Sequence, residues 1–297
     1  MTDTLEQRVA AALAREMAPE VRAFAERLVG DEALGVLFYG SNLRTGSLDG
    51  VLDFYVLTQG PVESGIWPRV SYHEWTTGGV TLRAKVATMT LATFAAAAAG
   101  HLLDTTIWAR FVQPSALAWS RDDSSTRAIE AAVSQAARTA ARLAVALGPA
   151  SGSADDFWRA LFRATYAAEF RVERAGREDS ILSANREHFS GLLPLALQAE
   201  GIAFERHGDT LTPNLRESRR RDLHRWWKRR QRLGKPYNLI RLVRASTTFE
   251  GAARYAAWKI ERHTGVVVPL NPWRERHPVL AAPGVLWRVW RARRRPA

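Results

Sequence analysis

The sequence predicts a mixed α+β protein, with strands in its front half and helices through most of its second half. Two short apolar runs rich in Val, Leu and aromatic residues lie at 35–40 and 51–58, each bounded by turn-forming residues, and an alternating segment follows at 79–90. A glycine- and serine-rich segment at 148–153 is typical of a domain boundary. We therefore expect one domain over 1–148, a second over 154–265 and a tail over 278–297.

The front domain is predicted to begin with an amphipathic helix over 5–29, which Gly30 ends. The elements expected after it are strands at 35–40, 51–58 and 79–90, a buried alanine-rich helix at 91–104, a closing segment at 105–114 and a helix at 124–147. The strand at 51–58 is unusual because a single acid, Asp53, stands inside its apolar run. An unpaired carboxylate is costly to bury, so we expect a cation or strong donors beside it.

The second domain is predicted to be mostly helical. The expected helices are 154–175, 180–200, 216–232 and 246–263. Between them, residues 201–213 alternate and contain turn-forming residues, which predicts a small two-stranded hairpin. Helices with such a hairpin suggest a winged-helix-like domain.

Composition excludes several classes of protein. The 297 residues are enough for a sizeable core, and the absence of cysteine rules out disulfides and a Cys-ligated zinc. The seven histidines show no metal-ligand spacing. The N-terminus carries acids rather than the pattern of a secretory signal, and no apolar run approaches the roughly 18 residues of a membrane span.

The net charge of +12 is concentrated late in the chain. Nine lysines and arginines and two acids lie between Arg216 and Arg232. Such a balance favours a polyanionic partner, which means a nucleotide, a nucleic acid or an anionic membrane surface. The alternative for this run is a solvated basic face.

The Gly40-Ser41 pair after the first strand and Asp53 in the second form a pattern with a chemical rationale. A glycine turn lets triphosphate oxygens approach the backbone closely, and a carboxylate on an adjacent strand can hold Mg²⁺ against them. The residues expected to contact the nucleotide are Tyr39, Gly40, Ser41 and Asn42. The order predicts a nucleotidyltransferase-type mixed sheet with Mg²⁺ as cofactor. Asp49 is the other carboxylate that can reach the metal, and the position of a second strand acid is held by Tyr55.

Further short motifs follow along the chain in the order found in one known family. They are Tyr39-Gly40-Ser41, Leu52-Asp53-Phe54, Leu82 to Lys85, Trp108 to Pro114, Glu169-Phe170-Arg171-Val172, Glu178-Asp179, Asn185 with His188-Phe189, and Arg244 to Thr247 with Arg254. Over 36–265 this order resembles the mitochondrial translocator assembly and maintenance-type phosphatidate cytidylyltransferases, also called CDP-diacylglycerol synthases. Members of that family also carry one Asp in the second strand.

The resemblance implies an activity and a set of site residues. The implied reaction transfers CMP from CTP to phosphatidic acid, giving CDP-diacylglycerol and pyrophosphate, with Mg²⁺ as cofactor. Catalysis is then assigned to Asp53, Lys85 and Arg110, and phosphate or lipid binding to Arg171, Asn185 and Arg244. The same resemblance implies a nucleotidyltransferase domain, a winged-helix domain and a C-terminal membrane-contacting helix.

The C-terminal segment itself combines tryptophan and arginine, which suits the interface of an anionic membrane. The residues expected to contact the membrane are Trp287, Arg288, Trp290 and Arg291. We expect a peripheral protein on the cytoplasmic, inner face of the cell membrane. The alternatives for this segment are a helix docked on the body or a free basic tail.

Two other functions compete with this interpretation. One keeps the fold and changes the acceptor to another phospholipid, a sugar phosphate, or a protein or RNA end. The other is a non-enzymatic nucleic-acid binder, in which Trp226 and Trp227 serve the basic run around them.

Overall fold

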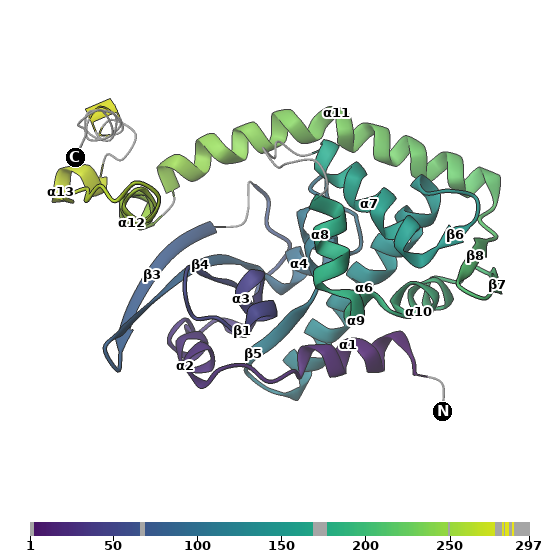
Figure 1. Ribbon diagram of the computed structural model, residues 1–297, viewed down its shortest axis with the longest axis horizontal. Coiled ribbons are helices and arrows are strands. Elements are labelled where there is room, and N and C mark those ends of the chain that lie inside the picture. Colours follow the sequence, from purple (N-terminus) through teal and green to yellow (C-terminus); the bar gives the residue numbers. More distant parts are fainter. Residues whose placement is uncertain are drawn as a thin grey trace.

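The computed structural model describes residues 3–65, 69–168, 177–248 and 250–276, together with 281, 283, 284 and 287 (Figure 1). It is a mixed α+β protein, as the sequence predicts. The front part of the chain contains α1 (Leu5–Leu13), α2 (Pro19–Arg27), β1 (Ala33–Tyr39), α3 (Ser41–Thr45), β2 (Leu52–Thr58), β3 (Arg69–Thr77), β4 (Val80–Thr90), α4 (Leu91–Ala98), α5 (Thr106–Phe111), β5 (Ser115–Ser120) and α6 (Asp123–Leu147). The remainder contains β6 (Gly152–Ser153), α7 (Ala154–Ala168), α8 (Arg177–Ala184), α9 (Arg186–Phe189), α10 (Leu192–Ala199), β7 (Phe204–His207), β8 (Thr210–Pro213), α11 (Glu217–Thr248), α12 (Ala252–Thr264) and α13 (Pro272–Arg276).

The larger sheet has five strands in the order β3-β4-β2-β1-β5. Strands β2 and β4 are parallel, and the other neighbouring pairs are antiparallel. Because side chains alternate along a strand, β2 divides its residues between two cores. Tyr55 and Leu57 join the large core beneath the helices, whereas Phe54 and Val56 pack toward α2. Asp53 therefore lies on the same face as the large core.

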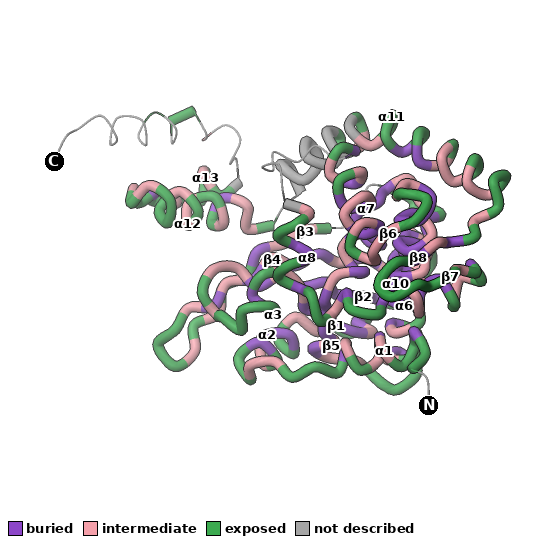
Figure 2. Tube along the Cα trace, turned by 45° about the vertical axis from the view of Figure 1, so that its right-hand side comes forward, coloured by how far each residue is buried: buried purple, intermediate pink, exposed green. Residues whose placement is uncertain are grey.

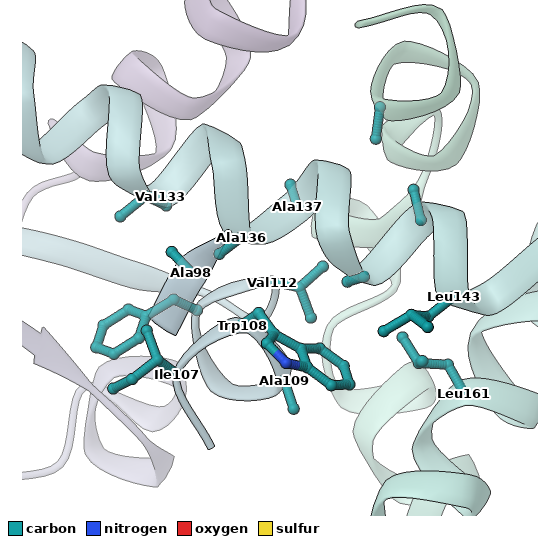
Figure 3. Packing of buried hydrophobic residues seen from close by; sticks show 14 of the residues in the cluster. Ala98, Ile107, Trp108, Ala109, Val112, Val133, Ala136, Ala137, Leu143 and Leu161 are labelled. Atoms are coloured by element: carbon teal, nitrogen blue, oxygen red, sulfur yellow. The ribbon is translucent and has the colours of Figure 1, made fainter. Parts of the chain in front are cut away.

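Helix α6 runs through the centre of the large core. The Asp122 side chain caps the start of α6 by accepting a 2.7 Å hydrogen bond from the Ser125 amide. Alanines cover several faces of the helix and let neighbouring helices approach closely. Trp108 of α5 is fully buried and lies beside α6 and Leu161 of α7 (Figure 3). One continuous core thus joins residues on both sides of the segment at 148–153.

The smaller sheet has three antiparallel strands in the order β6-β8-β7. Its β7–β8 hairpin confirms the hairpin predicted at 201–213. Helices α7 to α10 stand between β6 and β7 in the chain, and α11 then passes along the outside of the molecule (Figure 1). Figure 2 shows buried and exposed residues alternating along α11.

Several elements differ from the prediction. The single helix predicted over 5–29 is two helices, because Pro19 lacks an amide hydrogen and Ala18 before it takes an extended ψ of 139°. The helix predicted over 180–200 is divided by Asn185 and by Gly191, whose φ is +72°. Strands β3, β5 and β6 were not predicted, and α11 continues to Thr248 whereas the predicted helix ended at 232.

Strand β3 forms one edge of the five-stranded sheet, and the chain itself covers part of that edge. The Tyr72 amide donates a 2.8 Å hydrogen bond to the Glu250 carbonyl, beside a parallel bridge between Ser71 and Glu250. Gly251 follows with φ of +77°, and a β-carbon there would lie 2.9 Å from the Tyr72 carbonyl oxygen. Only glycine satisfies both the backbone angle and this close approach.

Among the described residues, none of the helices is both long and apolar enough to cross a bilayer.

Candidate functional site

The turn after β1 brings the backbone of Gly40 against the carboxylate of Asp53. Gly40 has φ of +93°, and a β-carbon at this position would lie 2.9 Å from Oδ2 of Asp53. Any other residue would meet both a strained backbone angle and the carboxylate. The pairing of Tyr39 with Asp53 across the two strands sets this proximity. The two ends of the predicted motif, Gly40 and Asp53, are therefore in contact.

The loop between β1 and β2 is held in shape by one buried side chain. Asn42 donates from Nδ2 to the carbonyl oxygens of Ser47 and Asp49, each at 2.8 Å. Its Oδ1 also lies 3.3 Å from the Ser41 hydroxyl, while Ser41 itself is exposed. Asn42, predicted to contact the nucleotide, thus has its amide engaged within the loop, and Ser41 is the side chain open to solvent.

Asp53 and Lys85 lie side by side on the same face of the sheet, because they are partners in the parallel β2–β4 register. Asp53 is partly buried, and its carboxylate accepts no hydrogen bond from any residue that the structure describes. Burial raises the pKa of Asp53 above its ordinary value, and the positive charges of Lys85 and Arg110 partly oppose that rise. An ionised Asp53 is therefore a carboxylate in need of a further cation or donor.

Arg110 lies near this carboxylate, on helix α5, which packs over the sheet. Its Nη1 donates a 3.0 Å hydrogen bond to the Tyr55 hydroxyl. The guanidinium also stands 5.1 Å from the ring centre of Tyr39 and 5.8 Å from that of Tyr55. Two tyrosines from neighbouring strands thus orient the guanidinium near Asp53.

Helix α12 approaches the other side of the loop. Arg262 donates to both carboxylate oxygens of Asp49, at 3.0 and 2.9 Å, and this pairing lowers the pKa of Asp49. The guanidinium groups of Arg83 and Arg262 each lie 5.4 Å from the ring centre of Trp258. Asp49, predicted as a second metal ligand, is therefore engaged by an arginine.

The remaining predicted residues lie apart from the cluster or outside the described residues. Asn185 is buried at the start of α9 and donates a 2.7 Å hydrogen bond to the Ile181 carbonyl, which is a structural role. Trp287 is exposed. The residues whose side chains lie outside the described part are Arg171, Arg244, Arg288, Trp290 and Arg291.

Two contributors to the site were missed from the sequence. Tyr55 was noted only as the residue replacing a second acid, yet its hydroxyl holds Arg110. Tyr55 stands two residues after Asp53, so both side chains lie on one face of the strand. This spacing could have indicated that Tyr55 belongs to the site. Arg262 was missed because it lies 213 residues from Asp49, and nothing in local sequence indicates that pairing.

The resulting site contains one carboxylate, two cations and an accessible glycine turn. Among the described residues, no group of three or more His, Cys, Asp or Glu side chains is arranged to hold a metal by itself. Mg²⁺ is commonly bound by one or two carboxylates together with substrate phosphates and water. Asp53 fits a Mg²⁺ ion that arrives with a triphosphate, and does not fit a site built from protein ligands alone.

Comparison with known proteins adds no assignment. No protein-family model matches the chain, and a search of curated proteins finds no relative at a significant level.

Proposed function

We propose that this protein is a nucleotidyltransferase that transfers CMP from CTP to phosphatidic acid. One observation carries the proposal: Asp53, Lys85 and Arg110 converge beside the Gly40 turn, and Asp53 has no described hydrogen-bond donor. A carboxylate flanked by two cations suits a metal-bound triphosphate, whose negative charge the cations also neutralise. The choice of CTP and phosphatidic acid follows from the resemblance in sequence motifs.

The fold proposal rests on strand order. In the larger sheet, β1, the Gly40 turn and β2 stand next to a parallel strand, which supports a nucleotidyltransferase-type domain over 1–148. In the smaller sheet, the order β6-β8-β7 with helices between β6 and β7 supports a winged-helix-like domain over 154–265. We also propose that the protein acts as a peripheral protein on the inner face of the cell membrane, where its lipid substrate lies.

The chain's own residues have distinct parts in the proposed reaction. Asp53 would hold the Mg²⁺ that accompanies the triphosphate, and that ion would neutralise phosphate charge when bound. The Gly40 backbone allows the phosphates to approach, and Ser41 is the open hydroxyl beside them. Lys85 and Arg110 bind phosphate oxygens, and Tyr55 keeps Arg110 in place.

The proposed reaction needs no dedicated base. An ionised phosphate oxygen of phosphatidic acid attacks the α-phosphorus of CTP and forms a new P–O bond. The bond from the α-phosphorus to the oxygen that bridges to the β-phosphorus breaks, and pyrophosphate leaves with that electron pair. The nucleophile is already ionised at neutral pH, so positioning and charge stabilisation carry catalysis.

The test is pyrophosphate release by purified protein with Mg²⁺, phosphatidic acid vesicles and each of the four nucleoside triphosphates in turn. We expect turnover with CTP that depends on the lipid. Asp53→Asn should lower the rate at least about a thousandfold, because the neutral amide cannot hold the cation. Asp31→Asn is the matched control, since Asp31 is an exposed carboxylate outside the site, and it should keep the wild-type rate.

Three results would contradict the proposal. Folded wild-type protein that is silent with every nucleotide would remove the enzymatic assignment. Full activity of folded Asp53→Asn would remove Asp53 from the metal site. Turnover with CTP and a soluble acceptor, without lipid, would replace phosphatidic acid as the acceptor.

A further inference from the structure

Helix α11 carries the basic run of the sequence, and its inner face uses part of that charge to hold the fold together. Arg230 is buried and donates to the carbonyl oxygens of Gly100 and Leu102 at 2.6 and 2.7 Å. Arg219 binds Glu200 at 2.9 Å, and Arg220 donates to the Ala146 carbonyl. These arginines satisfy buried carbonyl and carboxylate oxygens, so they are not open to a partner.

The two tryptophans of the run also face inward. Trp227 is 3 % exposed, and its ring lies 6.3 Å from that of buried Trp108. Trp226 packs against the same core and lies under the Arg230 guanidinium, 3.3 Å from it. Exposed aromatic rings are what single-stranded nucleic acid stacks on, and α11 does not present these two.

The outer face of α11 carries a separate set of exposed cations. Its members recur at spacings of three and four residues, which places them along one side of a helix. We call them the α11 basic stripe, and they are Arg221, Arg225, Lys228, Arg229 and Arg232. Within the described part of the chain, only Arg225 of this set makes an ion pair, with Asp222. Glu217 is the other exposed acid on the described length of α11.

Exposed apolar side chains adjoin the stripe toward the later turns of the helix. Leu233 is 41 % exposed and Ile240 is 53 % exposed. They lie one and eight residues after Arg232, beside the line of cations rather than on the buried face. In Figure 1, α11 runs along the upper edge of the molecule. The combination of cations with flanking aliphatic side chains is that of a surface lying on a lipid interface.

We propose that the α11 basic stripe docks this protein on an anionic lipid bilayer. The five cations, of which only Arg225 is paired with an acid among the described residues, complement a negatively charged membrane surface. Leu233 and Ile240 enter the apolar boundary beneath the headgroups, a contact that nucleic acid does not offer. The stripe residues are distinct from those of the C-terminal tail and of the Asp53 site, and lipid docking through them does not require the proposed chemistry.

The experiment is co-sedimentation with vesicles, without nucleotide or Mg²⁺, so that it is independent of catalysis. One set of vesicles is pure phosphatidylcholine, and the other contains equal parts of phosphatidylcholine and phosphatidylglycerol. Wild-type protein should bind the anionic set alone. The variant Lys228→Gln/Arg229→Gln/Arg232→Gln should bind it about a hundredfold more weakly, from about 1 kcal/mol for each cation near the surface.

A matched control removes the same charge from other faces. Arg22, Arg127 and Arg186 are exposed on α2, α6 and α9, so Arg22→Gln/Arg127→Gln/Arg186→Gln should keep wild-type vesicle binding within about threefold. Leu233→Ser/Ile240→Ser should weaken the part of binding that persists at high salt. The stripe variant and the Leu233/Ile240 variant should both keep the wild-type Tm, because the altered side chains are exposed.

Three outcomes would overturn the proposal. The first is equal loss of binding in the stripe variant and the matched control, which would indicate net charge alone. The second is wild-type vesicle binding by the stripe variant. The third is that wild-type protein binds duplex DNA or single-stranded RNA more tightly than anionic vesicles and that the stripe variant loses this binding. That result would assign the stripe to nucleic acid.

Discussion

Glu200 and Asp53 are both carboxylates close to cationic side chains, but their surroundings differ. Glu200 ends α10, its side chain is 6 % exposed, and three arginines hydrogen-bond it from α6 and α11. The three distances, from Arg138, Arg142 and Arg219, lie between 2.9 and 3.2 Å. Asp53 has Lys85 and Arg110 nearby, yet it accepts no hydrogen bond from the described residues.

The difference distinguishes a carboxylate with a structural role from one that we propose to be functional. Each Glu200 oxygen has a donor, so the group joins three helices at little cost. Asp53 is partly buried without such donors, and burial raises its pKa. Arg110 is held by Tyr55 rather than by Asp53. A carboxylate kept in this state suits a group that binds a cation with its substrate.

The largest effect on stability should come from Glu200→Gln, and Asp53→Asn is the variant to compare with it. Glu200→Gln should lower the free energy of unfolding by about 2 kcal/mol, because three arginines lose an anion in a mostly buried place. Asp53→Asn should leave that free energy unchanged or raise it, because it removes a charge whose burial is unfavourable. Urea unfolding of both variants measures the two values. Asp53→Asn being the more destabilising of the pair would break the comparison.

A smaller effect should appear in the pH dependence of the same two proteins. The folded pKa of Asp53 lies above its unfolded value, so the ionised group disfavours the fold at neutral pH. As pH falls through the folded pKa, the folded state binds the proton first and this cost is relieved. The stability advantage of Asp53→Asn over wild type should therefore shrink on acidification. Unfolding free energies at neutral and mildly acidic pH test this, and an advantage that grows in acid would contradict it.

The smallest effect should come from the ion pair between Asp49 and Arg262. Both side chains are substantially exposed, at 78 % and 42 %, and water screens such pairs strongly. Asp49→Asn, Arg262→Gln and the double variant should have the same Tm within error. A double-mutant cycle from thermal unfolding measures the coupling between the two residues. A clear coupling would place Asp49 with Glu200 as a structural carboxylate.

Elements with a strong local signal could be predicted from the sequence. The apolar runs of β1 and β2 and the capped, alanine-rich α6 agree with prediction within about two residues, the usual uncertainty of element ends. Strand β3 was missed because it lies at an edge and almost all its residues are exposed or half-buried, so they show no apolar alternation. Its pairing with β4 depends on a partner strand that local sequence does not reveal.

The site could be predicted only in part, for a similar reason. Gly40 and Asp53 were indicated by the order of turn and strand, and the structure brings them into contact. The hydrogen bond from Arg110 to Tyr55 joins residues 55 apart in the chain, and it depends on how α5 packs over the sheet. Spacing in sequence carries no information about such a contact.

The cover over β3 also bears on the solubility of the protein. An uncovered edge strand offers free amide and carbonyl groups to a strand of another molecule, which is a common start of aggregation. Here the backbone of Glu250 takes the Tyr72 amide, and Gly251 allows the covering segment to come that close. A bulkier residue at Gly251 would push this segment away from the strand. The molecule would then carry an open β-edge, and intermolecular strand addition would compete with its own native state.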